Sequence, residues 1–127
     1  MSDLKTAVEA LADGFGGEIF MPADAGFDEA RVVWNSMIDR RPTVIFRCRD
    51  AGDVIASVKL ASTQNMPVAI RGGGHNVAGH AVCDDGVMID LSLMRSVKVD
   101  TARRVAVAEG GALWRDVDAA TQAYGLA

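Results

Sequence analysis

The sequence has 127 residues, of which 50% are hydrophobic, and a formal net charge of −4 at pH 7. This length fits one domain with a sizeable core, and the acidic balance excludes a general nucleic-acid or membrane-surface binder, because such proteins carry a basic excess. No apolar run approaches the roughly 18 residues of a membrane-spanning helix, and no secretory signal pattern opens the chain, so we expect a cytoplasmic protein. Cys48 and Cys83 lack CxxC spacing and predict neither a disulfide framework nor a structural zinc site.

The first 41 residues are predicted to form a helical segment (residues 1–41). Apolar residues at helical spacing predict a helix from Ser2 to about Phe15, which the following glycines end. A loop with Pro22 follows, and the stretch FDEARVVWNSM predicts a second, short helix that presents Trp34. We expect Trp34, like Trp114 later in the chain, to be a core or half-buried anchor, and nothing in the sequence indicates a stacking role for either.

Residues 42–127 are predicted to form an α+β lobe around a parallel crossover. The stretch TVIFRC after Pro42 reads as a buried strand, Asp50 as the N-cap of a helix, and PVAIR as the next strand. The segment from Thr43 to Arg71 is therefore long enough for a β-α-β unit. The apolar stripe of its helix comprises Val54, Ile55, Val58 and Ala61.

Three more strands and a helix complete the predicted fold. GVMIDLS, SVKVD and RVAVAEG read as strands, and residues 100–103 join the last two. Gly125 is placed to end the final helix as a C′ glycine. The apolar stripe of that helix comprises Leu113, Val117, Ala120 and Tyr124.

The stretch PVAIRGGGHNVAGH places three consecutive glycines directly after a predicted strand. Free N–H groups in such a turn form a concave anion site, which is how several folds bind phosphate. A Rossmann fingerprint is excluded, because Val77 occupies its third glycine position and no amphipathic helix follows. A P-loop is excluded too, because His80 and Ala81 stand where a lysine and a hydroxyl residue belong.

Several side chains in and after this stretch are chemically able to bind a metal. They match no common zinc spacing and mix soft with hard ligands, so we expect no metal site. These residues are His75, His80, Cys83, Asp84 and Asp85. Cys83 is expected to be a small packed side chain, and Asp84–Asp85 to form a turn.

Three landmarks in order resemble one enzyme family. RGGGHNVAGH, then DDGVMIDLS and then EGGALWRDV are similar to the N-terminal part of flavin-dependent oxidases of the vanillyl-alcohol-oxidase type, in their berberine-bridge-enzyme-like and 6-hydroxy-D-nicotine-oxidase-like branch. The resemblance runs from about Pro42 to the end of the chain. It implies the N-terminal lobe of a PCMH-type FAD-binding domain, with an α+β fold and FAD as the cofactor.

The resemblance also implies roles for individual residues. The turn from Arg71 to His75 would wrap the FAD pyrophosphate, and His75 would carry a covalent bond to the 8α carbon of the flavin. An unprotonated imidazole nitrogen is a nucleophile near neutral pH, which suits this role. The cofactor-binding residues are then Arg71, Gly72, Gly73, Gly74, His75, Asn76, Gly79 and His80.

Some of these roles stay open at the level of the sequence. Asn76 and Gly79 are expected to shape the backbone near the cofactor, and a surface role for His80 is as well supported as a cofactor contact. Arg71 adds positive charge either by direct contact or through its field. The glycines of the EGG turn, Gly110 and Gly111, either approach the cofactor or only end a strand.

The resemblance implies an FAD-dependent oxidase that takes a hydride from a small organic substrate and passes the electrons to O₂. Relatives continue with the rest of the FAD domain and a substrate domain, so we expect this chain to be a truncated lobe without turnover of its own. The sequence identifies no catalytic base. The alternative is a non-catalytic module that keeps the fold without FAD and self-associates through apolar surface exposed by truncation.

Overall fold

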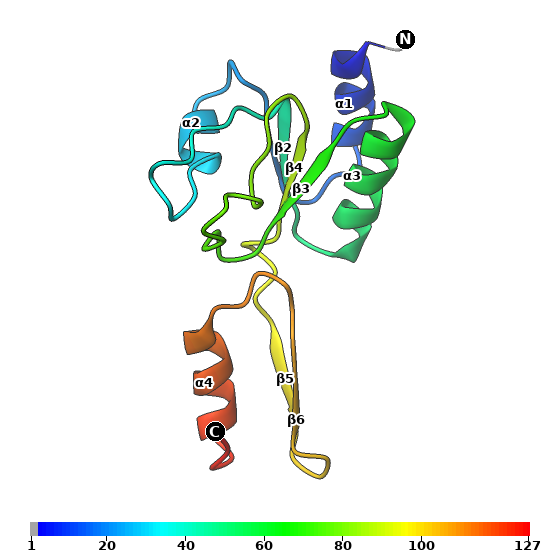
Figure 1. The fold of residues 1–127 in the computed structure, drawn as a ribbon. Helices are drawn as coiled ribbons and strands as arrows, with labels where there is room; N and C mark the ends of the chain where they lie inside the picture. Colours follow the sequence, from blue (N-terminus) through cyan, green and yellow to red (C-terminus); the bar gives the residue numbers. More distant parts are fainter. Residues whose placement is uncertain (1–2) are drawn as a thin grey trace.

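The computed structural model describes residues 3–127 and has two parts (Figure 1). A four-stranded sheet carries α1 and α3 on one face and α2 on the other, and a two-stranded hairpin with α4 beside it forms the second part. The fold class is α+β, as predicted. The elements are α1 (Leu4–Ala12), β1 (Glu18–Phe20), α2 (Phe27–Ala30), β2 (Val44–Arg47), α3 (Ala51–Thr63), β3 (Val68–Arg71), β4 (Val87–Asp90), β5 (Val97–Asp100), β6 (Val105–Ala108) and α4 (Trp114–Gln122). None of the helices within residues 3–127 has the length and apolar content to span a bilayer.

The four-stranded sheet has the order β1-β2-β4-β3. β2, β4 and β3 are parallel, and β1 pairs antiparallel with β2. The β2-α3-β3 unit is the crossover that the sequence predicts, but β4 lies between its two strands. The register places Phe46 and Ile70 on either side of Ile89, so the carboxyl ends of the three parallel strands meet at one edge. The segment that follows β3, residues 72–80, begins at this edge and is called the glycine loop below.

Alternate residues of the central strands fill two separate cores. Val44, Phe46 and Ile89 belong to the core with α1 and α3, whereas Ile45 and Met88 belong to the core with α2. All five side chains are fully buried. Because side chains alternate across a strand, a strand buried on both faces needs an almost continuous apolar run, and VIF and VMI supply it.

The start of α3 confirms the predicted N-cap. The Asp50 carboxylate accepts a hydrogen bond from the Asp53 N–H (3.0 Å). Asp53 is itself buried, and its carboxylate accepts from the N–H groups of Gly16 and Arg49 (2.9 Å each). Asp53 therefore ties the glycine turn after α1 to the start of α3, a role that the sequence did not indicate.

The second predicted helix is much shorter than expected. α2 ends at Ala30, and the chain beyond it is irregular. The carbonyl groups of Ala30 and Val32 accept hydrogen bonds from the Arg71 guanidinium (3.2 and 2.6 Å). The Trp34 N–H donates to the Gly74 carbonyl (2.9 Å). Hydrogen bonds to the glycine loop and to β3 therefore replace helical ones in this segment.

Two further predictions about the elements are wrong. Residues 18–20, predicted as loop, form β1 at the edge of the sheet. In α3 the predicted apolar stripe is only partly buried, because Ile55 and Val58 are 54% and 45% exposed. Ser57 and Leu60 are buried instead, so the face of α3 that meets the sheet is rotated away from the predicted one.

The hairpin and α4 agree more closely with the prediction. β5 and β6 are antiparallel, and α4 packs against both strands. The helix ends before Tyr124, but Gly125 (φ 67°) confirms the predicted C′ glycine. The Leu126 N–H donates to the Thr121 carbonyl (3.1 Å), and the Gly125 N–H to the Gln122 carbonyl (3.0 Å), as in a Schellman motif.

One carboxylate joins the start of α4 to the segment before β5. Asp116 accepts two hydrogen bonds from the Arg95 guanidinium (2.9 and 2.8 Å) and one from the Leu113 N–H (2.8 Å). The Arg95 hydrogen bonds, and next the Leu113 N–H, lower the pKa of Asp116 to about 2. Because this folded-state pKa lies below the usual aspartate value of about 4, Asp116 stabilises the fold above that pH.

We expect Asp116→Asn to lower the melting temperature at pH 7, because the asparagine loses the charge that Arg95 and the helix start favour. The stabilising effect of Asp116 is lost as the pH falls from about 4 towards 2, so the difference from wild type should narrow there. Asp118→Asn, on the same helix and exposed, is the control and should show no such narrowing. Thermal unfolding followed by circular dichroism at several pH values measures both. A constant difference across this range contradicts the prediction.

Candidate functional site

Most backbone N–H groups of the glycine loop have no protein partner in the described part of the chain. Within residues 3–127, no N–H from Gly72 to Ala78 donates to a protein acceptor. A hydrogen-bonded turn forms only at the end of the loop. There the Gly79 N–H donates to the Asn76 carbonyl (3.0 Å) and the His80 N–H donates to the Asn76 side-chain oxygen (3.2 Å). A run of free N–H groups on one short turn is the arrangement that binds anions through backbone dipoles.

Several carbonyl groups of the same loop accept hydrogen bonds from the segment before β2. The Trp34 N–H donates to the Gly74 carbonyl (2.9 Å), and the Asn35 side-chain amide donates to the Val77 carbonyl (2.9 Å). The Arg40 guanidinium donates to the Gly79 carbonyl (2.7 Å). The segment around residues 34–40 therefore binds carbonyl groups of the loop, whereas the N–H groups from Gly72 to Ala78 stay open to a ligand.

Individual glycines are required by close contacts in this loop. A Cβ on Gly72 would lie 2.7 Å from the Gly110 carbonyl oxygen, and one on Gly79 would lie 2.8 Å from the Ile38 side chain. Gly74 and Gly79 also have positive φ (74° and 80°). The loop therefore packs directly against the EGG turn and the segment before β2.

Arg71 lies at the base of the loop, but its guanidinium faces the protein. It donates to the carbonyl groups of Ala30 and Val32, and its Nε lies buried without a partner among the residues that the structure describes. Gly74 packs against this Nε, at 3.0 Å from an added Cβ. Arg71 therefore supplies fixed positive charge beneath the loop while it holds the segment after α2.

A cleft of about 840 Å³ opens beside the glycine loop. The loop contributes Gly73 and His75 to its wall, and β6 and the start of α4 form the rest. Small side chains of Ala106, Ala108 and Ala112 leave room in it, and the remaining lining residues are Leu113, Trp114, Arg115 and Val117. The cleft is thus mostly apolar, next to a row of free N–H donors, which suits a ligand with a flat ring system and a phosphate group.

His75 stacks on Trp34 at the edge of this cleft. The ring centroids are 4.9 Å apart and the planes differ by 12°. Trp34 is 74% exposed, and Trp114 is 81% exposed, so the prediction that both are core or half-buried anchors is wrong. Nothing in the sequence indicated the stack that Trp34 forms. Neither ring nitrogen of His75 forms a hydrogen bond within residues 3–127.

Asn76, Gly79 and His80 belong to the glycine loop but do not line the cleft. Asn76 caps the turn that leads to His80, and Gly79 is buried against Ile38, which agrees with a backbone-shaping role for both. His80 is exposed and is not part of the cleft wall. Contacts of these three residues with FAD stay predictions.

Sequence reasoning missed the far wall of the cleft and the Trp34 stack. The alternation of small and branched residues in RVAVAEG was a usable indication, because Ala106 and Ala108 both line the cleft. Gly110 and Gly111 instead serve packing, since a Cβ on Gly111 would lie 1.7 Å from the Leu91 carbonyl oxygen. These contacts show a packing role for both glycines, whereas their approach to the cofactor stays a prediction.

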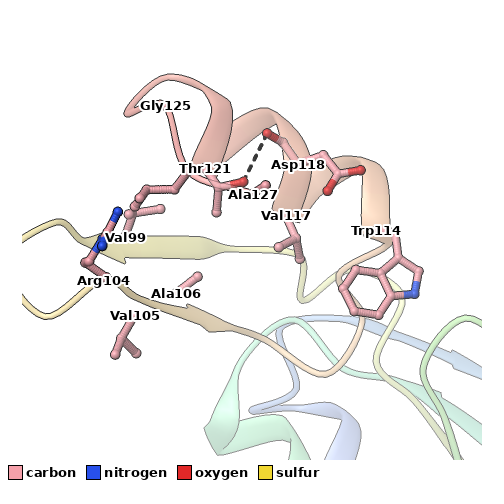
Figure 2. Close-up of a pocket in the computed structure, with 11 residues that line it drawn as sticks. Val99, Arg104, Val105, Ala106, Trp114, Val117, Asp118, Thr121, Gly125 and Ala127 are labelled. Carbon is pink, nitrogen blue, oxygen red and sulfur yellow. Dashed lines mark hydrogen bonds between the residues drawn. The ribbon is translucent and has the colours of Figure 1, made fainter.

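A second, smaller cleft of about 430 Å³ lies between α4 and the hairpin (Figure 2). Figure 2 shows Val99 and Val117 among its lining residues, with Arg104 at one end and Trp114 at the other. It contains no part of the glycine loop. The free N–H donors therefore single out the larger cleft as the candidate site.

The cysteines and the other residues that are chemically able to bind a metal form no metal site in the described part of the chain. Cys83 contacts the backbone near Val87, and burial raises the pKa of its thiol. Burial likewise raises the pKa of Cys48 to about 11, so both side chains are neutral thiols near pH 7. Among residues 3–127, no three His, Cys, Asp or Glu side chains are grouped so as to hold a metal ion.

Comparisons with known proteins identify the family of the chain. Residues 42–127 match the family described as FAD binding domain. The chain is 40% identical over 111 residues to (R)-6-hydroxynicotine oxidase of Paenarthrobacter nicotinovorans. This match covers 87% of this chain and 24% of that protein. It is 35% identical over 112 residues to the FAD-linked oxidoreductase hasG of Aspergillus fumigatus, covering 88% of this chain and 24% of that protein. The chain thus spans about a quarter of the length of these relatives.

Solved structures show the same fold. The crystal structure of 6-hydroxy-D-nicotine oxidase from Arthrobacter nicotinovorans superimposes with a TM-score of 0.82 at 38% identity, over 87% of this chain and 24% of that one. Physcomitrella patens BBE-like 1 superimposes with a TM-score of 0.74 at 22% identity, over 84% of this chain and 23% of that one. The chain therefore belongs to the FAD binding domain family, of the PCMH type, that occurs in FAD-linked oxidoreductases.

Proposed function

We propose that this chain binds FAD, with the pyrophosphate on the glycine loop and the flavin ring in the 840 Å³ cleft. The observation that carries the proposal is the run of free N–H groups from Gly72 to Ala78 beside an apolar cleft that Gly73 and His75 line. The net charge of −4 works against binding an anion. Local donors, rather than the overall charge, therefore account for phosphate binding.

The residues divide into direct and indirect roles. The N–H groups of the glycine loop would contact the pyrophosphate, because the carbonyl groups of Gly74, Val77 and Gly79 are already bound by the protein. Arg71 acts through its field, because its guanidinium donates to two backbone carbonyl groups. Of the two readings of Arg71, this geometry favours the one without direct contact.

His75 is proposed as the covalent anchor of the flavin. It lines the cleft, and no protein group occupies its ring nitrogens within residues 3–127. An imidazole nitrogen of His75 would be bonded to the 8α carbon in place of one hydrogen of that carbon. The hydrogen from each of the two partners would be transferred to dioxygen, which would be reduced to hydrogen peroxide. The link fixes the position of the cofactor.

We further propose that the longer protein to which this lobe corresponds oxidises a small organic substrate with O₂ as the acceptor. The similar proteins from Paenarthrobacter and Aspergillus are named as an oxidase and an FAD-linked oxidoreductase. FAD supplies the hydride-accepting chemistry when it is bound. The glycine loop and His75 hold and orient it, whereas substrate contacts are expected outside these 127 residues.

The purified chain, refolded with FAD under air, tests the proposal. We expect a yellow protein whose colour remains in the pellet after acid precipitation, and an intact mass that has increased by one FAD. An acid-released flavin with saturable binding supports FAD binding but contradicts the covalent link. A colourless chain that neither binds FAD in equilibrium dialysis nor gains mass contradicts the whole proposal.

One observation favours the alternative of a self-associating module without FAD. Every residue of β6 is exposed, with Val105 at 47% and Val107 at 66%. An exposed apolar edge strand is a surface that another chain can pair with. A colourless chain that is dimeric in size-exclusion chromatography with light scattering supports this alternative, whereas a yellow monomer supports FAD binding.

A further inference from the structure

The stack of His75 on Trp34 has no evident role in the fold. Both side chains are exposed, and Trp34 keeps 74% of its surface open to solvent. A large aromatic residue that stays exposed next to a candidate nucleophile is an informative exception, because burial does not explain it. The contact geometry, with 4.9 Å between ring centroids and 12° between planes, is that of a specific stacked pair.

The backbone on both sides of the pair is fixed. The Trp34 N–H donates to the Gly74 carbonyl (2.9 Å), and the Asn35 side chain donates to the Val77 carbonyl (2.9 Å). These bonds place Trp34 and His75 opposite each other on two loops that are far apart in the sequence. The indole therefore has a defined position before any ligand binds.

Gly73 makes room for the imidazole in this position. A Cβ on Gly73 would lie 3.3 Å from Cδ2 of His75, which is closer than most real contacts. With the indole against one ring face and the Gly73 backbone near the ring edge, the imidazole has few orientations available. In a neutral imidazole the lone pair of one nitrogen and the N–H bond of the other both lie in the ring plane, so the indole on one ring face blocks neither nitrogen at the edge of the cleft.

We propose that Trp34 is a positioning residue that orients the His75 imidazole for bond formation with the flavin. The inference rests on the proposed function, since it concerns how His75 reaches the 8α carbon. Trp34 does not itself take part in the bond. It restricts rotation of a side chain that no hydrogen bond holds within residues 3–127, and so lowers the entropy that His75 loses when it reacts.

Three variants of the full chain test this inference. Trp34→Ala removes the stack, Trp34→Phe keeps an aromatic face, and Met37→Ala removes an 89% exposed side chain from the same segment as a control. All three retain the backbone N–H at position 34. Because Trp34 is exposed, we expect each variant to fold, which circular dichroism checks.

The first readout does not depend on the flavin. The chain has two histidines, so the ring protons of His75 are assigned in NMR spectra by their absence in His75→Ala. The indole ring current should shift them upfield in the wild type and in Met37→Ala, less so in Trp34→Phe, and not in Trp34→Ala. Unchanged His75 signals in Trp34→Ala would mean that the stack does not exist in solution, and the inference would be overturned.

The second readout is the rate at which acid-stable flavin forms after FAD is added under air. Trp34→Ala should slow it roughly three- to tenfold, as expected for one stacking contact, whereas Trp34→Phe should recover most of the rate. If Trp34→Ala forms the link at the wild-type rate, the inference is wrong and the proposed function stands. If the wild type forms no link, the covalent anchor fails and the inference fails with it.

Discussion

Replacing His75 by alanine is expected to abolish acid-stable flavin completely while FAD still binds reversibly. The reason is that the link needs an imidazole nitrogen, whereas the pyrophosphate is held by backbone N–H groups between Gly72 and Ala78, which the substitution leaves in place. The carbonyl groups of the loop also keep their donors, because the Trp34 backbone N–H and the side chains of Asn35 and Arg40 form no hydrogen bond with the His75 side chain. Absorbance of the acid pellet measures the link, and equilibrium dialysis measures reversible binding.

His80→Ala is the matched variant, because it changes the other histidine of the same loop. His80 is exposed and does not line the cleft, so we expect this variant to keep acid-stable flavin. Acid-stable flavin in His75→Ala together with its loss in His80→Ala would transfer the anchor to His80. Loss of reversible FAD binding in His75→Ala would show that the imidazole, rather than the backbone, provides most of the affinity.

The central strands and α3 could be predicted because their sequence patterns are strong and local. VIF and VMI are short apolar runs with β-branched residues, and Asp50 followed by Asp53 is a clear helix start. β1 was missed because it has only three residues, Glu18–Phe20, and depends on pairing with β2. The position of β4 between β2 and β3 could not be predicted either, because the hydrophobic periodicity of a sequence does not determine which strands become neighbours.

The candidate site was predictable on one side only. The glycines mark the loop because backbone that comes this close to other groups needs them, as Gly72 and Gly79 show. Trp34 could not be assigned, because its contact with His75 depends on two loops that meet only in the folded chain. The three apolar residues 32–34 are consecutive and do not follow helical spacing. This pattern could have indicated that the predicted second helix ends early, as α2 does at Ala30.

Gly111→Ala is expected to destabilise the fold by about 3 kcal/mol, at the upper end of what overpacking by one methyl group costs. The added Cβ would lie 1.7 Å from the Leu91 carbonyl oxygen and 2.8 Å from that of Met94. Both oxygens belong to backbone that is held by further hydrogen bonds, including Met94 N–H to the Leu91 carbonyl (2.8 Å) and Gly111 N–H to the Met94 carbonyl (2.9 Å). The clash therefore cannot be relieved by a side-chain rotation, and the EGG turn has to move away from the sheet.

Gly14→Ala provides the control, because nothing lies within 4 Å of its added Cβ and its φ is not positive. A glycine-to-alanine change at such a position restricts the unfolded chain and should stabilise by about 0.4–1 kcal/mol, so the two variants are expected to have opposite signs. Urea unfolding followed by circular dichroism measures both.

Displacing the EGG turn also shifts Ala112 and Leu113 in the wall of the cleft, so Gly111→Ala should weaken FAD binding even in urea-free buffer. A Gly111→Ala variant as stable as the wild type would mean that the EGG turn is not packed against Leu91 in solution. The wall of the cleft that begins at this turn would then not be fixed beside the glycine loop.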